Sequence, residues 1–275
     1  MRKRRWQAAG GIAVLTLLGV AMIAPFLYMV SVSFMGEAEL LRWPPALIPE
    51  APTASNYVAA LDALSYRVFL NTALLAGVVM IGQLLTSAAA GYAFARMRFP
   101  GRDGVFATVV AMLAVPAFLL LIPRYLLIST LGWVDTYPGL MSTELVSVWG
   151  IVLMRQSFLM LPRDVEDAAR LDGAGEWTLF WRVALPLAKP AVAALALLAF
   201  MDQWRNFLWP LVVTRSRDME VAEVALAHFH TTYAGNWPYQ MAAAVLVTLP
   251  VLLICLMAQR SLMQGVRVTG ASVRL

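Results

Sequence analysis

The sequence has 275 residues, of which 61% are hydrophobic and only 13% are charged, and its mean hydropathy is +0.72. Soluble domains are roughly 45–50% apolar, so a soluble core could not hide this much apolar surface and the lipid bilayer is the expected solvent. A net charge of +5 raises nucleic acid as a partner, but the basic residues flank apolar runs, which indicates membrane topology instead. The single cysteine, Cys255, excludes a disulfide framework within the chain.

The N-terminus, MRKRRWQ, precedes an apolar stretch that continues to about Phe34. A cleaved signal peptide shares the basic start, but its apolar region is only about 7–15 residues long, roughly half the length found here. The pattern therefore favours an uncleaved helix that spans the bilayer.

Six apolar runs are long enough to cross a bilayer, which takes about 20 residues of helix. No internal repeat, low-complexity tract or soluble domain interrupts them. The sequence thus predicts an all-α integral membrane protein, a single domain over residues 1–275 with six transmembrane helices. Prolines inside the runs either kink the helices or are tolerated through neighbouring packing. The predicted spans are residues 10–34, 69–94, 105–127, 139–160, 190–213 and 239–259.

Basic residues are unevenly distributed between these spans, and they accumulate on the cytoplasmic side of membrane proteins. The side that holds the termini carries 15 of them, and both termini are therefore predicted to be cytoplasmic. These are Arg2, Lys3, Arg4, Arg5, Arg96, Arg98, Arg102, Arg155, Arg163, Arg170, Arg182, Lys189, Arg260, Arg267 and Arg274, against Arg42, Arg67, Arg215 and Arg217 on the opposite side.

A polar insert, residues 161–189, separates spans four and five on the cytoplasmic side. Its sequence EDAARLDGAGEWTLFWRVALPLAKP (166–190) holds seven charged residues. Asp164 can cap a first helix, and Gly173 can end that helix with a left-handed residue. Val165, Ala168 and Ala169 follow the i, i+3, i+4 spacing of one helix face, so they predict a small-residue surface on which another protein can lie close.

A second helix is predicted after Gly173, and prolines end it before span five. Trp177, Phe180, Trp181 and Ala184 recur at i, i+3, i+4 and i+7, which predicts one bulky face. The alternative is an amphipathic helix resting on lipid headgroups. The acidic first helix fits that alternative poorly, because the inner leaflet is anionic.

The insert resembles the EAA loop in the permease subunits of binding-protein-dependent ABC importers. That pattern is Glu-Ala-Ala, three residues, Gly, nine residues, Ile, one residue and Leu-Pro. At those positions this chain has Asp167-Ala168-Ala169, Gly173, Val183 and Leu185-Pro186. Asp172-Gly173-Ala174 also matches the carbohydrate branch of the family.

Further stretches resemble the maltose-type second permease subunit, so the resemblance covers nearly the whole chain. It implies the type I importer fold, a helical core around a translocation path. It also implies partners: a second permease, two ATPase subunits and an extracytoplasmic solute-binding protein. The family usually has Asn where Arg205 stands. The matching stretches are GYAFARMRFPGRD (91–103), LMRQSF (153–158), WRNFLWPL (204–211) and QRSLMQGVRVTGA (259–271).

In that family the loop is a coupling helix that sits in a groove on the ATPase subunit and transmits its closure to the spans. The resemblance implies that Asp167 offers a carboxylate to a basic group of the groove, although Asp is one methylene shorter than the family's Glu. The residues assigned to ATPase coupling are Glu166, Asp167, Ala168, Ala169, Asp172, Gly173, Val183, Leu185 and Pro186.

The chain has no G-x-x-x-x-G-K-[ST] motif and no Gly-Lys pair at all. It is therefore not expected to bind or hydrolyse ATP itself, and no catalytic residue or cofactor is predicted within it. ATP and Mg²⁺ are expected in the partner ATPase subunits, so the chain is a permease subunit and not an enzyme.

Span five carries an uninterrupted polar cluster, and polar residues inside a membrane usually face a pore or a partner. Gln203, Trp204, Arg205 and Asn206 offer the hydrogen-bonding groups and aromatic face that a sugar path needs. An alternative is structural pairing between helices, of Arg205 with Asp202 or with Glu144.

The predicted outer segment 214–238 contains His228 and His230 together with two glutamates, Glu220 and Glu223. A metal site is one interpretation. A surface loop that touches the solute-binding protein is favoured, and no metal is predicted. The predicted contact is Gly235, Asn236 and Trp237.

These patterns predict a permease subunit of an ATP-driven importer for a carbohydrate or related polyol. It would form half of the translocation path in a bacterial or archaeal cytoplasmic membrane, in contact with lipid and without nucleic acid. A self-contained secondary transporter is the first alternative, although such proteins often show inverted repeats. The second alternative is a membrane scaffold without a transport role.

Overall fold

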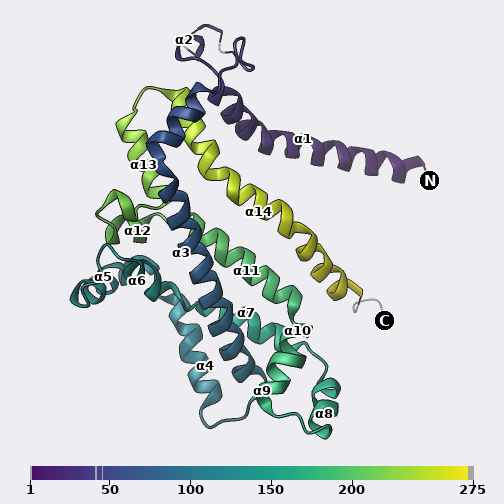
Figure 1. The fold of residues 1–275 in the computed structure, drawn as a ribbon. Coiled ribbons are helices and arrows are strands. Elements are labelled where there is room, and N and C mark those ends of the chain that lie inside the picture. Colours follow the sequence, from purple (N-terminus) through teal and green to yellow (C-terminus); the bar gives the residue numbers. More distant parts are fainter. Residues whose placement is uncertain (1, 41, 45, 272–275) are drawn as a thin grey trace. The chain divides into compact units, whose positions relative to one another are not determined.

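The computed structural model describes residues 2–40, 42–44 and 46–271, and its regular elements over those residues are all helical (Figure 1). The all-α prediction is confirmed for this part of the chain. The chain divides into two compact units: unit 1 comprises Met1–Tyr66 and Ala225–Leu249, and unit 2 comprises Arg67–Val224 and Pro250–Leu275.

Unit 1 is built from two stretches that are far apart in the sequence. The side chain of Asn56 ties the end of α1 to the start of α3, because its Nδ2 donates to the carbonyls of Ser33 and Met35 at 3.0 and 2.9 Å. The helices are α1 (Arg2–Ser33), α2 (Glu37–Leu40), the first part of α3 (Ser55–Arg96), most of α13 (Ala222–Thr232) and the first part of α14 (Trp237–Ala271).

Unit 2 holds the rest of α3, the ends of α13 and α14 that lie outside unit 1, and all elements between α3 and α13. They are α4 (Arg102–Ala111), η1 (Met112–Ala114), η2 (Ala117–Leu120), α5 (Leu121–Thr130), α6 (Tyr137–Met141), η3 (Ser142–Glu144), α7 (Val148–Leu159), α8 (Arg163–Leu171), α9 (Glu176–Thr178), η4 (Leu179–Ala184), α10 (Leu185–Leu187), α11 (Lys189–Trp204), α12 (Leu208–Val213) and η5 (Arg217–Met219).

Three helices in the described residues are long and apolar enough to cross a membrane, within α1, α3 and α14. Three bent helix pairs bring the number to six if each pair counts as one span. The bends measure 97° between η1 and η2, 43° between η3 and α7, and 78° between α10 and α11. Three to six spans are therefore supported, and several predicted runs are broken helices.

The predicted helix 105–127 is the sharpest departure from the sequence expectation, because it breaks at Pro116. Proline lacks an N–H and pushes the preceding residue out of the α region. Val115 accordingly has an extended backbone (φ −84°, ψ 116°). Hydropathy registers the apolar length of such a run but not its bend.

Small residues allow α3 and α7 of unit 2 to pack closely. A Cβ added to Gly91 of α3 would lie 2.8 Å from the backbone nitrogen of Arg155, and one added to Gly150 of α7 would lie 2.4 Å from Ser87 Oγ. Around this contact, Tyr92, Phe158 and Phe180 form part of one buried cluster. A second buried cluster joins α3 to α5, α6 and α12, so α3 supports both cores of unit 2.

Candidate functional site

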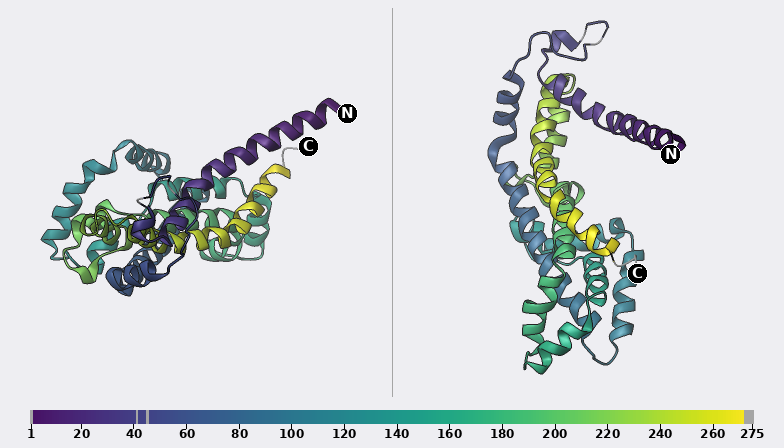
Figure 2. Two further views of the ribbon diagram at one scale, coloured as in Figure 1. Left: turned by 90° about the horizontal axis from the view of Figure 1, so that it is seen from above. Right: turned by 90° about the vertical axis from the view of Figure 1, so that its right-hand side faces the viewer.

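The insert that the sequence singles out forms α8 to α10, which follow α7 at the same end of unit 2 as the turn after Arg96 (Figures 1 and 2). Pro162 occupies the N-cap of α8 with an extended backbone (φ −60°, ψ 131°), and no side chain caps the helix. The prediction that Asp164 caps α8 is therefore wrong. Proline begins the helix at Arg163, and Asp164 lies in the first turn, where a carboxylate favours the helix dipole.

Gly173 ends α8 as predicted, in a left-handed conformation with φ +84°. Its N–H donates to the carbonyl of Arg170, and the N–H of Ala174 donates to that of Ala169, both at 3.0 Å. This pair of bonds is the Schellman motif, which satisfies the last carbonyls of a helix. The chain can therefore reverse sharply into α9.

α8 has one face turned into unit 2 and one exposed face. Glu166 is buried, whereas Asp167 and Ala168 are exposed and Ala169 is partly exposed. Leu171 has the most exposed large apolar side chain among the residues whose burial is described, at 90%. The predicted small-residue surface is therefore present, and Leu171 extends it. The sequence analysis did not single out Leu171, because one leucine in an apolar chain gives no signal.

Arg96 at the end of α3 joins the buried face of α8. Its Nε lies 3.1 Å from Oε1 of Glu166, and the two side chains are only 5% and 8% exposed. Its Nη2 also donates to the carbonyls of Phe158 and Leu161, at 2.7 and 2.6 Å. These are carbonyls at and beyond the end of α7, where helices lack internal partners. Glu166, assigned to ATPase coupling on the resemblance, thus contacts Arg96 of its own chain.

A second connection runs through Glu176 at the start of α9. Its Oε2 accepts a hydrogen bond from the Tyr92 hydroxyl at 3.2 Å, and its Oε1 pairs with Arg170 of α8 at 2.6 Å. The Arg170–Glu176 pair is 43% exposed on both sides. Two residues of α3 therefore hold both helices of the insert.

The second predicted helix is divided into three short pieces, with a π-helix over Leu179–Ala184 between α9 and α10. The three predicted aromatic residues do form one cluster, because the Phe180 ring lies 6.1 Å from that of Trp177 and 5.0 Å from that of Trp181. The cluster is only partly exposed, because Phe180 and Ala184 are buried in the core of unit 2. Trp177 and Trp181 remain exposed, at 73% and 46%. On its inner side the Phe180 ring packs against Tyr92 and Phe158, with ring centres 5.3 and 6.5 Å away.

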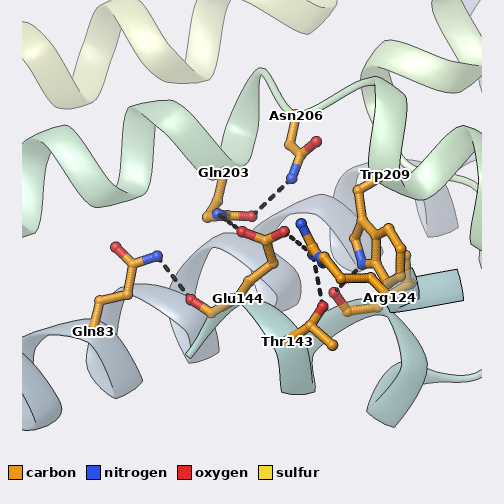
Figure 3. A network of polar contacts seen from close by, with 8 residues as sticks. Gln83, Arg124, Thr143, Glu144, Gln203, Asn206 and Trp209 are labelled. Carbon is orange, nitrogen blue, oxygen red and sulfur yellow. Dashed lines mark hydrogen bonds and ion pairs between the residues drawn. The ribbon is translucent and has the colours of Figure 1, made fainter. Parts of the chain in front are cut away.

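Toward the other end of unit 2, a polar network surrounds Glu144 (Figure 3). Its side chain pairs with Arg124 and accepts a hydrogen bond from Gln203 Nε2 at 3.3 Å, while its carbonyl accepts one from Gln83 at 2.8 Å. Asn206 Nδ2 donates to Gln203 Oε1 at 3.2 Å. The alternative pairing of Arg205 with Glu144 is wrong, because Glu144 pairs with Arg124.

Arg124 is held from several sides, which fixes its guanidinium beside Glu144. Its Nη2 donates to Thr143 Oγ1 at 2.6 Å, and its guanidinium carbon lies 4.1 Å from the ring centre of Trp209. Trp209 in turn donates to the Leu140 carbonyl at 3.1 Å. The network therefore joins a cation of α5, a carboxylate of η3 and an aromatic ring of α12.

A cavity of about 640 Å³ adjoins this network. Of the four residues predicted to face a path, Arg205 and Asn206 line this cavity, whereas Gln203 and Trp204 do not, because both are buried. The complete lining is Ala117, Phe118, Leu121, Arg124, Glu144, Leu198, Met201, Asp202, Arg205, Asn206, Phe207, Leu208 and Trp209. Two arginines, two carboxylates, an amide and aromatic rings thus face one space.

The predicted solute-binding-protein contact lies in unit 1. Gly235 has φ +96°, Asn236 accepts a hydrogen bond from the backbone N–H of Tyr239 at 3.1 Å, and Trp237 is exposed. His230 Nδ1 lies 2.7 Å from Gln240 Oε1, so this ring interacts with an amide. Among the described residues, no group of three or more His, Cys, Asp or Glu could hold a metal ion.

Comparison with known proteins gives one family over most of the chain. Residues 83–268 match the family described as "Binding-protein-dependent transport system inner membrane component". The arabinooligosaccharides transport system permease protein of Halalkalibacterium halodurans is 34% identical over 93% of this chain and 95% of its own length. The diacetylchitobiose uptake system permease protein of Streptomyces coelicolor is 33% identical over 90% of this chain and 83% of its own length. The sn-glycerol-3-phosphate transport system permease protein of Rhizobium meliloti is 30% identical over 92% of this chain and 93% of its own length.

Solved structures agree on the fold. A chain of a bacterial ABC transporter involved in the import of the acidic polysaccharide alginate superposes with a TM-score of 0.83, at 25% identity, over 94% of this chain and 98% of that one. A chain of the bacterial alginate transporter, in complex with a periplasmic protein that holds an alginate pentasaccharide, superposes with a TM-score of 0.65 at 14% identity, over 93% of both chains. The first is a close structural neighbour, and the second shows the fold alone.

Proposed function

Because this chain belongs to the family of binding-protein-dependent transport system inner membrane components, we propose that it is a permease subunit of an importer for a sugar or related polyol. Relatives named for arabinooligosaccharides and diacetylchitobiose support the substrate class. The sn-glycerol-3-phosphate relative supports its extension to polyols. The chain lies in a bacterial-type cytoplasmic membrane with both termini in the cytoplasm, in keeping with its basic residues.

The importer is completed by a second permease, two ATPase subunits and an extracytoplasmic solute-binding protein. ATP and Mg²⁺ bind to the ATPase subunits, because this sequence lacks a phosphate-binding loop. The loop Gly235–Trp237 contacts the solute-binding protein, since an exposed tryptophan beside a left-handed glycine offers a protruding apolar surface. The chain performs no covalent chemistry.

The outer face of α8 binds the ATPase, and the two-sided geometry of α8 is the observation that carries this proposal. One side of the helix is fixed to its own chain through Glu166, and the other exposes Leu171 with the carboxylate of Asp167. An apolar side chain beside carboxylates suits an apolar groove with a basic rim. Val183, Leu185 and Pro186 support the far end of the same insert, where Leu185 and Val183 are partly buried.

The cavity beside Glu144 forms this chain's share of the translocation path. Arg205 and Asn206 present polar groups to it, and Phe118 and Phe207 add aromatic rings. Sugars are bound by such combinations of hydrogen-bonding groups and flat apolar surfaces. Gln203 and Trp204 support the wall from behind and do not face the path.

Co-expression with the other genes of the locus and purification through a tag on this chain tests the proposal. Recovery of a second permease and an ATPase is expected, and Asp167→Ala and Leu171→Asp should reduce recovery of the ATPase. Loss of one partner of an interfacial charge pair costs about 2–5 kcal/mol when the pair is buried, enough to weaken binding at least about 30-fold. Sugar uptake should continue when the proton gradient is collapsed with ATP retained.

Asp103→Ala is the matched control, because it removes an exposed carboxylate from the first turn of another helix, α4. It should leave recovery of the ATPase unchanged. Wild-type recovery and transport by Asp167→Ala together with Leu171→Asp would exclude α8 as the docking helix. A wild-type chain that purifies without an ATPase in mild detergent would exclude the importer itself.

A further inference from the structure

We propose that Arg96 is a positioning residue that makes α3, α7 and α8 move as one body, so that α3 carries the motion of α8 across unit 2. This inference rests on the proposed function, because it assumes that an ATPase moves α8. To the proposed function it adds the path along which the motion of α8 travels and the residue that transmits this motion. The insert contacts α3 through Arg96 and Tyr92 but continues in the chain into α11, so its motion has two possible routes.

Arg96 has the geometry of a joint between three elements. It belongs to α3, its guanidinium bonds two carbonyls at the end of α7, and it pairs with Glu166 of α8. Arginine holds its nitrogens in one rigid plane, so the two carbonyls and the paired carboxylate are fixed relative to one another. A lysine has the charge but not this planar fork, and it cannot hold the same three positions.

Burial makes this joint stiff. The Arg96 and Glu166 side chains are 5% and 8% exposed, so water cannot replace either partner during motion. The neighbouring pair of Arg170 and Glu176 is 43% exposed on both sides. Water and salt screen such a pair, and it can break and re-form at small cost. Of the two ion pairs of the insert, one is therefore fixed and one can yield.

The far end of α3 within unit 2 is also fixed. Asn71 Nδ2 donates to the carbonyls of Asp218 and Glu220, at 2.8 and 3.0 Å, and its Oδ1 accepts a hydrogen bond from the Tyr137 hydroxyl at 2.7 Å. Thr72 Oγ1 accepts one from the N–H of Ala222 at 2.7 Å. The segment η5 and its flanks are therefore attached to α3 through its side chains.

The stretch of α3 between Asn71 and Arg96 can act as a lever. It contains no proline, and the non-helical residue of α3, Ser65, lies outside it. Its 25 residue steps at 1.5 Å each make it about 38 Å long. A displacement of α8 applied at Arg96 therefore reaches Asn71 and the segment after α12 without passing through the 78° bend between α10 and α11.

The test uses the complete complex in lipid nanodiscs, with sugar moved per ATP hydrolysed as the readout. Glu166→Gln keeps the size of the side chain without its charge, and Arg96→Lys keeps the charge without the fork. Both should hydrolyse ATP but move about fivefold less sugar per ATP or worse, a coupling loss within the usual range of linked sites. Arg170→Gln, which breaks the exposed pair, should stay within about twofold of wild type.

A merely stabilising role would lower the yield of complex but leave the ratio of sugar to ATP per complex unchanged. An unchanged ratio in assembled Glu166→Gln and Arg96→Lys complexes would overturn the inference while the importer proposal stands. Failure of the wild-type chain to bind an ATPase would instead refute the proposed function.

A second measurement decides the case in which the variants do not assemble. Spin labels on the exposed positions Arg163 and Leu74 of the full purified chain report the distance between α8 and α3. The distance distribution should be narrow in the wild type and in Arg170→Gln, and broad in Arg96→Lys. An equally narrow distribution in Arg96→Lys would overturn the inference.

Discussion

Gly173 ends α8 with a backbone conformation that other residues reach only at a cost. Its φ is +84°, and no atom lies within 4 Å of an added Cβ. A side chain would therefore meet no steric clash, and its cost would come only from the left-handed backbone conformation. Gly173→Ala should destabilise the end of α8 by about 1–2 kcal/mol. Hydrogen exchange of the Gly173 and Ala174 amides should increase accordingly.

Gly175→Ser is the control for that prediction. Gly175 has an ordinary φ of −77° at the N-cap of α9, where serine is a preferred residue. In Gly175→Ser the hydrogen-exchange rates of the Gly173 and Ala174 amides should match or fall below those of the wild type. Equal protection in Gly173→Ala and Gly175→Ser would show that the left-handed turn does not fix the end of α8.

Asp135 holds the segment after α12 through its carboxylate. Its Oδ1 accepts hydrogen bonds from the N–H groups of Arg215 and Ser216, at 2.8 and 3.1 Å, and these bonds hold the pKa of the carboxyl below its ordinary value of 3.8. A lowered folded-state pKa stabilises the fold above the ordinary value, and this contribution is lost as the pH falls through the folded-state pKa.

The melting temperature of Asp135→Ala should therefore lie below that of the wild type at pH 7, and the difference should shrink as the pH falls below about 3.8. Thermal unfolding in detergent between pH 7 and pH 3 measures this. Asp135→Asn keeps an acceptor oxygen and tolerates the left-handed backbone, so its melting temperature should fall less at pH 7. A difference between Asp135→Ala and wild type that does not change with pH would contradict the role of the charge.

Sequence reasoning found the residues of the insert whose roles are local and missed the partners of those that pair with distant helices. Gly173 follows from the helix pattern around it. Arg96 of α3 and Glu166 of α8 pair between two helices that are far apart in the sequence. A single sequence shows the periodicity of each helix but not which residues of two helices meet. The same limit explains why Glu144 is one of two alternative partners for Arg205 in the sequence, whereas in the structure it pairs with Arg124.

At the scale of elements, the contact of α3 with α7 depends on glycines that admit the facing backbone. Gly91→Ala places a methyl group within 3 Å of the α7 backbone and should destabilise unit 2 by about 1–3 kcal/mol. Gly77→Ala lies on the same helix with open space around it, so helix propensity should make it neutral or more stable by about 0.5–1 kcal/mol.

Unfolding of the two variants by denaturing detergent in mixed micelles compares their free energies directly. The prediction requires Gly91→Ala to be the less stable variant. Equal stability of the two would mean that α3 and α7 can separate without cost.

Apolar runs were predictable element by element, but their breaks were not. The prolines inside the runs are possible kinks in the sequence, but the sequence does not show that one helix ends at Pro116 and another begins there at 97°. The π-helix at Leu179–Ala184 likewise depends on which ring the core accepts. Local propensity cannot decide such cases, because tertiary packing overrides it.

At the scale of the whole molecule, the match of residues 83–268 to the transport family confirms the resemblance drawn from the insert. The relatives are named as permease proteins, in agreement with the expectation of a transport subunit and not an enzyme. The excess of basic residues then predicts the orientation of the chain in the membrane.

Alkaline phosphatase, which is active only outside the cytoplasm, should be inactive when fused after residue 174 or at the C-terminus. It should be active when fused after residue 50 or 235, in the predicted outer segments. A cytoplasmic reporter at the same four positions should give the opposite pattern. Phosphatase activity after residue 174 would place the insert on the wrong side for an ATPase.

The joint at Arg96 also sets an order for biosynthesis. Glu166 leaves the ribosome 70 residues after Arg96, a delay of about 4–14 s at 5–20 residues per second. Until residues 158–166 have been made, the guanidinium stays hydrated beside the bilayer, because neither the two carbonyls nor the carboxylate that it contacts exist yet. α8 is fixed for docking only after the first four apolar runs have been made, so an ATPase that recognises the fixed helix would pass over shorter nascent chains.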